Sequence, residues 1–111
     1  MNKSAFDRAP DVEVLFEFNA VRIHPALDGY RPQHLVTEDY LTTGVHHYYD
    51  VQTVSPGGSA KGTITFLTPD AYPKCLWEGK KIQIREGART VGHATVLRVI
   101  NPVLLTEEVR L

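Results

Sequence analysis

The side chains of this chain that could do chemistry are five histidines, one cysteine and scattered carboxylates. His46 and His47 are adjacent on an expected strand, so their side chains point to opposite faces and cannot chelate one metal ion. His24, His34 and His93 fall in no metal-ligand spacing that we recognise. We therefore interpret the histidines as surface or turn residues and expect no metal site.

Two further segments have only a superficial likeness to reactive motifs. Cys75 stands beside Leu76 and Trp77, which is typical of a packed small hydrophobe, and no motif places a base next to it. Residues 57–63 (GGSAKGT) lack the Gly-Lys-Ser/Thr of a phosphate loop, and they join strand to strand with no helix behind them. We therefore expect a protein that is not an enzyme and that carries no cofactor.

Size and charge limit the possible partners. The 111 residues fit one domain, and the net charge of −1 with a pI of about 6.5 argues against strong, sequence-blind nucleic-acid binding. A small basic face is still compatible with these values.

A single cysteine excludes an internal disulfide. Residues 1–10 lack the apolar stretch of a signal peptide, and no apolar run approaches the roughly 20 residues that span a bilayer, so we expect a cytoplasmic protein.

Short strands must position these residues, because no segment has a helical period over a window of about eleven residues. Residues 12–18 alternate apolar and polar side chains, which predicts a half-buried strand. Further strands are expected at residues 30–36, 45–51, 60–67, 81–86 and 90–100. Six antiparallel strands with short turns predict an all-β fold, either a closed barrel or a sandwich, and a closed six-stranded β-barrel is favoured because closure removes exposed edges. We expect the barrel at 11–102, with a flexible lead at 1–10 and a C-terminal tail at 103–111.

Three segments of the chain have a distinctive composition: residues 29–33 (GYRPQ), residues 55–57 (SPG) and residues 85–92 (REGARTVG). Together, and in this order, they resemble the third, C-terminal domain of elongation factor Tu, which has a similar strand opening, a Met-Pro-Gly turn and an REGGRTVG hairpin. The similarity runs from about residue 11 to residue 101. The resemblance implies a six-stranded antiparallel β-barrel, in agreement with the strands expected from the periodicity.

The resemblance also implies a set of RNA-binding residues. In elongation factor Tu this domain contacts the T-stem backbone of aminoacyl-tRNA and offers surfaces to partner proteins. Arginines can hold phosphates bidentately, an exposed glycine lets a backbone N–H approach one, and a glutamate can accept from a ribose 2′-hydroxyl. The positions that match those contacts are Arg22, Gln33, Thr43, Arg85, Glu86 and Gly87.

The chain departs from the family pattern in two loops and in its extent. The segments 37–43 and 71–80 are longer than in the family, and they would either block its interfaces or create new ones. No GTP-binding domain and no second barrel accompany the domain in this sequence. We therefore expect no GTPase switch, and an RNA affinity that is weak and sensitive to salt.

Two functions of different classes stay open. The first is a translation-associated accessory that binds tRNA or other structured RNA. The second is a protein-binding mimic of elongation factor Tu, an immunity or decoy protein that captures a partner or toxin, with Tyr72 and Trp77 as candidate partner-binding residues. The alternative for these aromatics is barrel packing and loop cover. The alternative for the Arg85–Gly87 hairpin is a tight turn that needs its glycine. A ligand pocket inside the barrel is least favoured, because small barrels fill their interiors with side chains.

Overall fold

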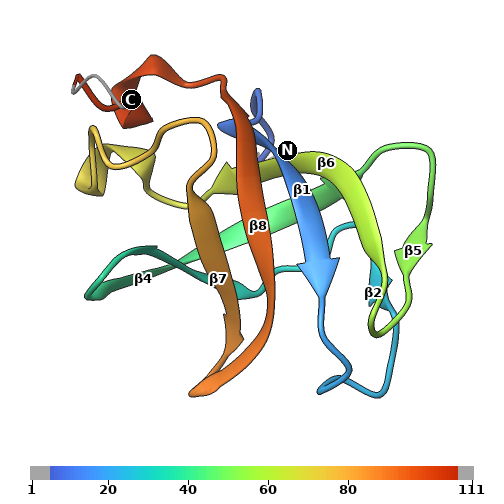
Figure 1. The fold of residues 1–111 in the computed structure, drawn as a ribbon. Coiled ribbons are helices and arrows are strands. Elements are labelled where there is room, and N and C mark those ends of the chain that lie inside the picture. The colour runs from blue at the N-terminus through green and yellow to red at the C-terminus, as the bar shows by residue number, and fades with distance from the viewer. Residues whose placement is uncertain (1–5, 108–111) are drawn as a thin grey trace.

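A computed structural model describes residues 6–107, which form an all-β fold around a closed six-stranded antiparallel barrel (Figure 1). The strands pair in the order β1-β6-β4-β3-β7-β8, and β8 closes the barrel on β1. This confirms the predicted fold. The bounds of the barrel strands are β1 Val12–Phe18, β3 Gln33–Thr37, β4 Tyr40–Tyr48, β6 Ser59–Phe66, β7 Lys81–Glu86 and β8 Arg89–Val99.

Four short elements complete the described chain. Strands β2 (Ala26–Leu27) and β5 (Thr53–Val54) form a separate two-stranded sheet. Two single turns of 3-10 helix, η1 (Pro69–Ala71) and η2 (Pro102–Leu104), lie together at the end of the barrel near the chain termini (Figure 1). No helix within residues 6–107 has the length and apolar character needed to cross a bilayer.

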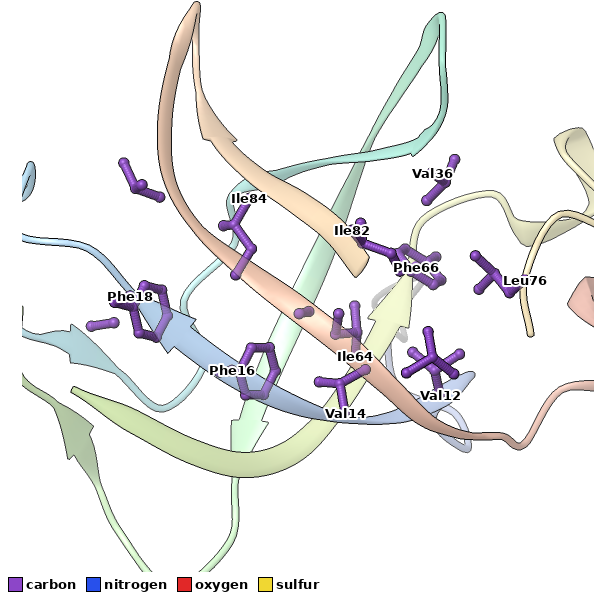
Figure 2. Close-up of a cluster of buried hydrophobic side chains, with 14 of the residues drawn as sticks. Val12, Val14, Phe16, Phe18, Val36, Ile64, Phe66, Leu76, Ile82 and Ile84 are labelled. Atoms are coloured by element: carbon purple, nitrogen blue, oxygen red, sulfur yellow. The ribbon is translucent and has the colours of Figure 1, made fainter. Parts of the chain in front are cut away.

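The alternating pattern of β1 explains how the barrel fills its interior. Val12, Val14 and Phe16 are fully buried and Phe18 nearly so, while the residues between them face outward. Figure 2 shows these side chains meeting apolar residues of the other strands, among them Ile64 of β6, inside the barrel. Each such side chain contributes about 1.5–3 kcal/mol when it is fully buried. The interior is therefore a packed core.

Close approach between β4 and β6 requires a glycine. A Cβ atom on Gly62 would lie 2.0 Å from the carbonyl oxygen of His47 on the neighbouring strand. On the inner side, a Cβ atom on Gly44 would lie 2.7 Å from a methyl group of Ile64 and 3.0 Å from the ring of His34. These two glycines allow β4 to pass tightly against β6 and against the side chains in the interior.

Two predicted strands differ from the observed ones by more than one residue at an end. The strand expected at 30–36 begins only at Gln33, although the carbonyls of Tyr30 and Pro32 still accept hydrogen bonds from the amides of His46 and Gly44. The strand expected at 45–51 is β4, which begins earlier, at Tyr40, so the segment 37–43 that was expected as a loop is mostly strand. It ends at Tyr48, because Asp50 has a φ of 63°, outside the β region.

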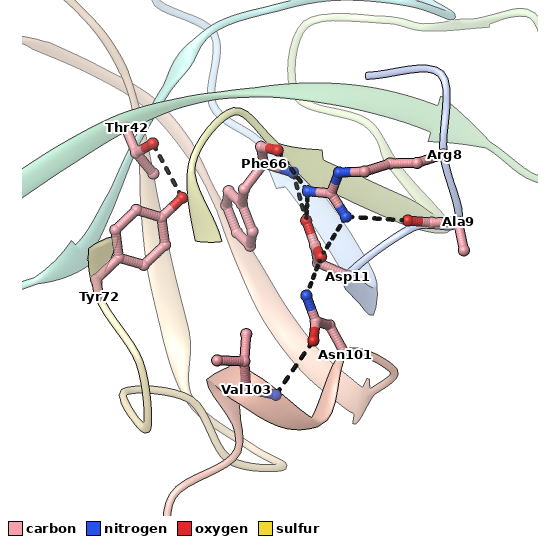
Figure 3. Close-up of polar contacts among 8 residues, drawn as sticks. All are labelled: Arg8, Ala9, Asp11, Thr42, Phe66, Tyr72, Asn101 and Val103. Carbon is pink, nitrogen blue, oxygen red and sulfur yellow. Dashed lines mark hydrogen bonds and ion pairs between the residues drawn. The ribbon is translucent and has the colours of Figure 1, made fainter. Parts of the chain in front are cut away.

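The described part of the predicted flexible lead is attached to the barrel. Arg8 donates to both carboxylate oxygens of Asp11, at 2.9 and 2.8 Å, and to the carbonyl of Phe66. Asp11 is fully buried and also accepts from the Phe66 amide and from the side chain of Asn101 (Figure 3). The prediction of a flexible lead at 1–10 did not include the buried carboxylate of Asp11, which follows Pro10 directly and binds Arg8.

The described part of the predicted tail is also packed. Leu104 is fully buried, Leu105 forms a β-bridge with Leu76, and Thr106 donates its amide to the carbonyl of Leu76. Residues 103–107 therefore cover one end of the barrel. Residues 1–5 and 108–111 lie outside the described residues.

Candidate functional site

Three of the predicted RNA-binding residues lie side by side across the barrel wall. Gln33 of β3 pairs in register with Thr43 of β4 on one side and with Arg85 of β7 on the other. Arg85 pairs in turn with Thr90 of β8. Side chains directly opposite each other on neighbouring strands are about 4.5–5.5 Å apart at Cβ. We call Thr43, Gln33, Arg85 and Thr90 the Gln33 row.

The Gln33 row faces outward. Gln33 is exposed, whereas His34, the next residue on β3, is fully buried. Arg85 is half-buried; its two terminal nitrogens donate to the side chain of Gln83 and to the carbonyl of Ala88, both at 3.3 Å. Within the described chain, the Nε of Arg85 is buried without a hydrogen-bond partner. Arg85 is thus held in place by weak contacts and keeps an unused donor.

The remaining predicted residues meet around Glu86, at the end of β7. Arg22 places its Nε 2.9 Å from one oxygen of Glu86, and Arg89 places a terminal nitrogen 3.0 Å from the other. The hydroxyl of Tyr30 also donates to Glu86, and the guanidinium of Arg22 lies 4.5 Å from the centroid of the Tyr30 ring. We call Arg22, Tyr30, Glu86 and Arg89 the Glu86 cluster.

The Glu86 cluster is held as an ion network with excess positive charge. Burial opposes ionisation of Glu86, but hydrogen bonds from Tyr30 and Arg89 and the charge of Arg22 outweigh it and hold the pKa of Glu86 below its ordinary value. Burial, reinforced by the bond to Glu86, raises the pKa of Tyr30. Two arginines against one glutamate leave the cluster positive, and Nη1 of Arg22 is a buried donor without a partner among the described residues.

Gly87 completes the hairpin between β7 and β8. Its φ of 62° lies in the left-handed region, which is the conformation that a tight turn requires of it, and a Cβ there would meet no atom within 4 Å. The turn alone therefore accounts for this glycine. The structure brings all six predicted residues to one end of β7, with Thr43, Gln33 and Arg85 on the outer wall and Arg22 and Glu86 beside the hairpin.

The two predicted partner-binding aromatics differ in exposure. Tyr72 is only 5% exposed, and its hydroxyl lies 3.0 Å from that of Thr42 (Figure 3). Burial raises its pKa to about 12. It is a core residue, so its prediction as a docking residue is wrong. Trp77 is half-buried and lines a surface groove of about 310 Å³ between β3 and the segment before β7. Tyr48 of β4 is likewise a core residue, with 2% of its surface exposed.

Two histidines predicted to be at the surface lie in the interior. His34 and His46 are fully buried, and their Nε2 atoms are 2.7 Å apart. Nδ1 of His34 is 3.3 Å from the carbonyl oxygen of Thr42, and Nδ1 of His46 is 3.0 Å from the hydroxyl of Tyr48. Adjacent His47 is exposed, so the prediction that His46 and His47 face opposite sides is confirmed. Strand alternation offered a signal, since His34 shares a face with buried Val36.

One proton arrangement satisfies this buried chain. A carbonyl oxygen only accepts, so Nδ1 of His34 carries a proton and Nε2 of neutral His34 accepts. Nε2 of His46 must then donate to it, and Nδ1 of His46 accepts from the Tyr48 hydroxyl. Burial lowers the pKa of His34 to about 4, and burial together with the neighbouring His34 lowers the pKa of His46. Both rings are neutral at pH 7.

No group of three or more histidine, cysteine or acidic side chains within residues 6–107 is arranged to hold a metal ion. Burial raises the pKa of the Cys75 thiol, which is the opposite of what a nucleophilic cysteine needs. In a comparison with known protein families, no family model matches this sequence.

Proposed function

We propose that this barrel is a non-enzymatic domain that binds the backbone of double-helical RNA, such as a tRNA stem, through the Gln33 row and the Glu86 cluster. The observation that carries the proposal is the register of β3, which aligns Gln33 with Thr43 and Arg85. The resemblance to the third domain of elongation factor Tu selected these residues without reference to that register. A translation-associated role follows from the same resemblance.

The chemistry of the row and the cluster suits a phosphate backbone. Arg85 is half-buried and uses its terminal nitrogens only in two contacts at 3.3 Å, so its guanidinium, which carries five N–H donors, has further donors and a positive charge for a phosphate. Gln33 and Thr43 add neutral donors beside them. Glu86 accepts hydrogen bonds from Tyr30 and Arg89 and forms an ion pair with Arg22, which leaves capacity to accept from a ribose 2′-hydroxyl and so to favour RNA over DNA.

A titration of a fluorescently labelled RNA hairpin by anisotropy at low salt tests the proposal. Arg85→Gln should weaken binding about tenfold, corresponding to about 1.5 kcal/mol for one charged hydrogen bond, and should reduce the salt slope by about one. Arg98→Gln is the matched control, because Arg98 is exposed near the opposite end of β8 and should bind like the unmodified protein. An absence of binding at high micromolar protein, or equal losses in both variants, would contradict the proposal.

A second candidate is the protein-binding mimic of elongation factor Tu. The observation in its favour is an exposed apolar segment between β1 and β2, where Val21 is 43% and Ile23 is 84% exposed, followed by Leu27 at 60%. Exposed apolar side chains close together are typical of protein interfaces. Capture of one specific protein from the native cell, abolished by Ile23→Asp but retained by Arg85→Gln, would support this candidate over RNA binding.

A further inference from the structure

The groove beside Trp77, which we call the Trp77 groove, adjoins the Gln33 row on the outer face of β3 and β7. Leu35 lies two residues beyond Gln33 on β3, and Gln83 lies two residues before Arg85 on β7; both line the groove. Residues two apart on a strand share a face and are separated by about 6.6 Å. Gln83 joins the two surfaces directly, because its side-chain oxygen accepts hydrogen bonds from Arg85 at 3.3 Å and from Thr90 at 3.2 Å.

The lining of the Trp77 groove combines an apolar floor with positive charge. Leu35 and the half-buried indole of Trp77 supply flat apolar surface. The ammonium group of Lys80 lies 4.7 Å from the centroid of the indole, and exposed Lys81 stands at the rim. The ammonium group of Lys80 also donates to the carbonyls of Val36 and Cys75, at 2.5 and 2.7 Å, so Lys80 is fixed in the lining and exposed Lys81 is the cation that faces a ligand from the rim.

A nucleotide matches this combination, since it joins one aromatic base to one phosphate. The volume of about 310 Å³ is at the lower end of small-ligand sites, which suits a single nucleotide. Base stacking on aromatic side chains beside basic residues is how proteins hold unpaired nucleotides without reading sequence. A fully paired stem on the Gln33 row would leave the groove empty.

We infer that the Trp77 groove binds an unpaired nucleotide that flanks the RNA stem held by the Gln33 row. The base stacks against Trp77 and Leu35, and the phosphate lies toward Lys81. This inference rests on the proposed function, because the stem must be bound for its flanking nucleotide to reach the groove. It makes the stem-to-single-strand junction the preferred RNA feature.

Two labelled RNAs test the inference: a blunt duplex, and the same duplex with a three-nucleotide single-stranded overhang. Trp77 is the only tryptophan of the chain, so its fluorescence reports on the groove alone. The overhang should tighten binding about five- to tenfold and quench Trp77 emission, whereas the blunt duplex should bind without quenching. Trp77→Leu should bind both RNAs equally, and Trp77→Phe, which keeps a ring, should retain most of the preference. Thermal unfolding of both variants checks that they fold.

The outcomes separate the inference from the proposed function. Equal binding of the two RNAs with unchanged Trp77 emission would overturn the groove assignment and leave the Gln33 row as the RNA site. A preference for the overhang that Trp77→Leu retains, with the variant folded, would also overturn it. Failure of both RNAs to bind would overturn the proposed function and the inference together.

Discussion

Acidification should destabilise this barrel through the two histidines in its interior. His34 and His46 form a chain of three hydrogen bonds in which both rings are neutral. A proton on Nε2 of His34 would force His46 into its other tautomer, with Nδ1–H directed at the Tyr48 hydroxyl, and would place a cation in the interior of the barrel. In the contacts around the pair the rings meet Phe16, Phe18, Phe66 and the two tyrosines Tyr30 and Tyr48, and none of these carries a charge that could balance an imidazolium.

Charged groups approach the pair through its two tyrosine neighbours. Glu86 bonds to the hydroxyl of Tyr30, whose ring contacts His46 edge-on, and Glu86 forms an ion pair with Arg22 at 2.9 Å. The carboxylate of Asp28 accepts from the backbone amide of Tyr48 and does not contact either imidazole ring. No carboxylate of the described residues therefore contacts the buried imidazole rings. Their protonation is favourable only in the unfolded chain, so it is coupled to unfolding.

The expected loss follows from the pKa values. Folding lowers the pKa of His34 from 6.5 to about 4, so the stability that depends on neutral His34 is fully present above pH 6.5 and falls as the pH drops toward 4. From pH 7 to pH 5 this linkage removes about 2 kcal/mol for one histidine, at 1.36 kcal/mol per pH unit once the unfolded state is protonated. The lowered pKa of His46 has the same sign, so protonation of the unfolded state at His46 adds to the loss.

Urea unfolding at a series of pH values between 7 and 5 measures this loss. In that interval the pKa of Glu86, already held below its ordinary value, keeps its ion pairs intact. The double variant His34→Gln/His46→Gln keeps amide donors and acceptors but cannot titrate, so its stability should be nearly flat over the interval. His47→Gln, at the exposed neighbour on the same strand, should fall as steeply as the unmodified protein.

The result that would refute this reasoning is a loss below about 1 kcal/mol between pH 7 and pH 5 in the unmodified protein. Equal slopes in the unmodified protein and in the double glutamine variant would refute it as well, because the titrating groups would then lie elsewhere.

Four other substitutions test the packing and the ends of the barrel. Asp11→Ala removes a fully buried carboxylate that accepts four hydrogen bonds, so it should lower the free energy of unfolding in urea by about 3 kcal/mol or more, and Asn101→Ala should cost about 1 kcal/mol. Gly62→Ala should prevent formation of the native barrel in circular dichroism and size-exclusion measurements, because its Cβ would lie 2.0 Å from a backbone oxygen. Gly87→Ala, at a positive φ with open space around it, should cost only about 1 kcal/mol by thermal unfolding.

Local pattern was enough to predict the strands whose two faces differ most. Residues 12–18 and 81–86 alternate cleanly, and β1 and β7 begin and end where that alternation does. Tyr72 was misjudged because a loop residue has no period that reports its burial, and only the fold shows it packed edge-on against Phe66. Arg8 likewise binds a carbonyl 58 residues away, which no local pattern can indicate.

The candidate site depended on information that composition does not contain. A net charge of −1 argued against nucleic-acid binding, whereas Arg22, Arg85 and Arg89 gather at one end of β7. The resemblance supplied the residues, and the register then placed three of them in one row. The contact between His34 and His46 and the alignment of the Gln33 row both depend on how β3 pairs with β4. Neither can be predicted from a pattern within one strand.

The buried pair and the exposed row are two consequences of one strand register. Gln33 and His34 are consecutive on β3, so the pleat that turns His34 inward turns Gln33 outward. A slip of β3 by one residue would put His34 in solvent and Gln33 in the core, leaving His46 without its partner at 2.7 Å. A slipped strand would leave the buried imidazole of His46 without a hydrogen-bond partner and would expose Val36, and both effects favour the observed register. That register aligns Gln33 with Thr43 and Arg85. The proposed RNA surface therefore depends on two histidines that lie inside the barrel.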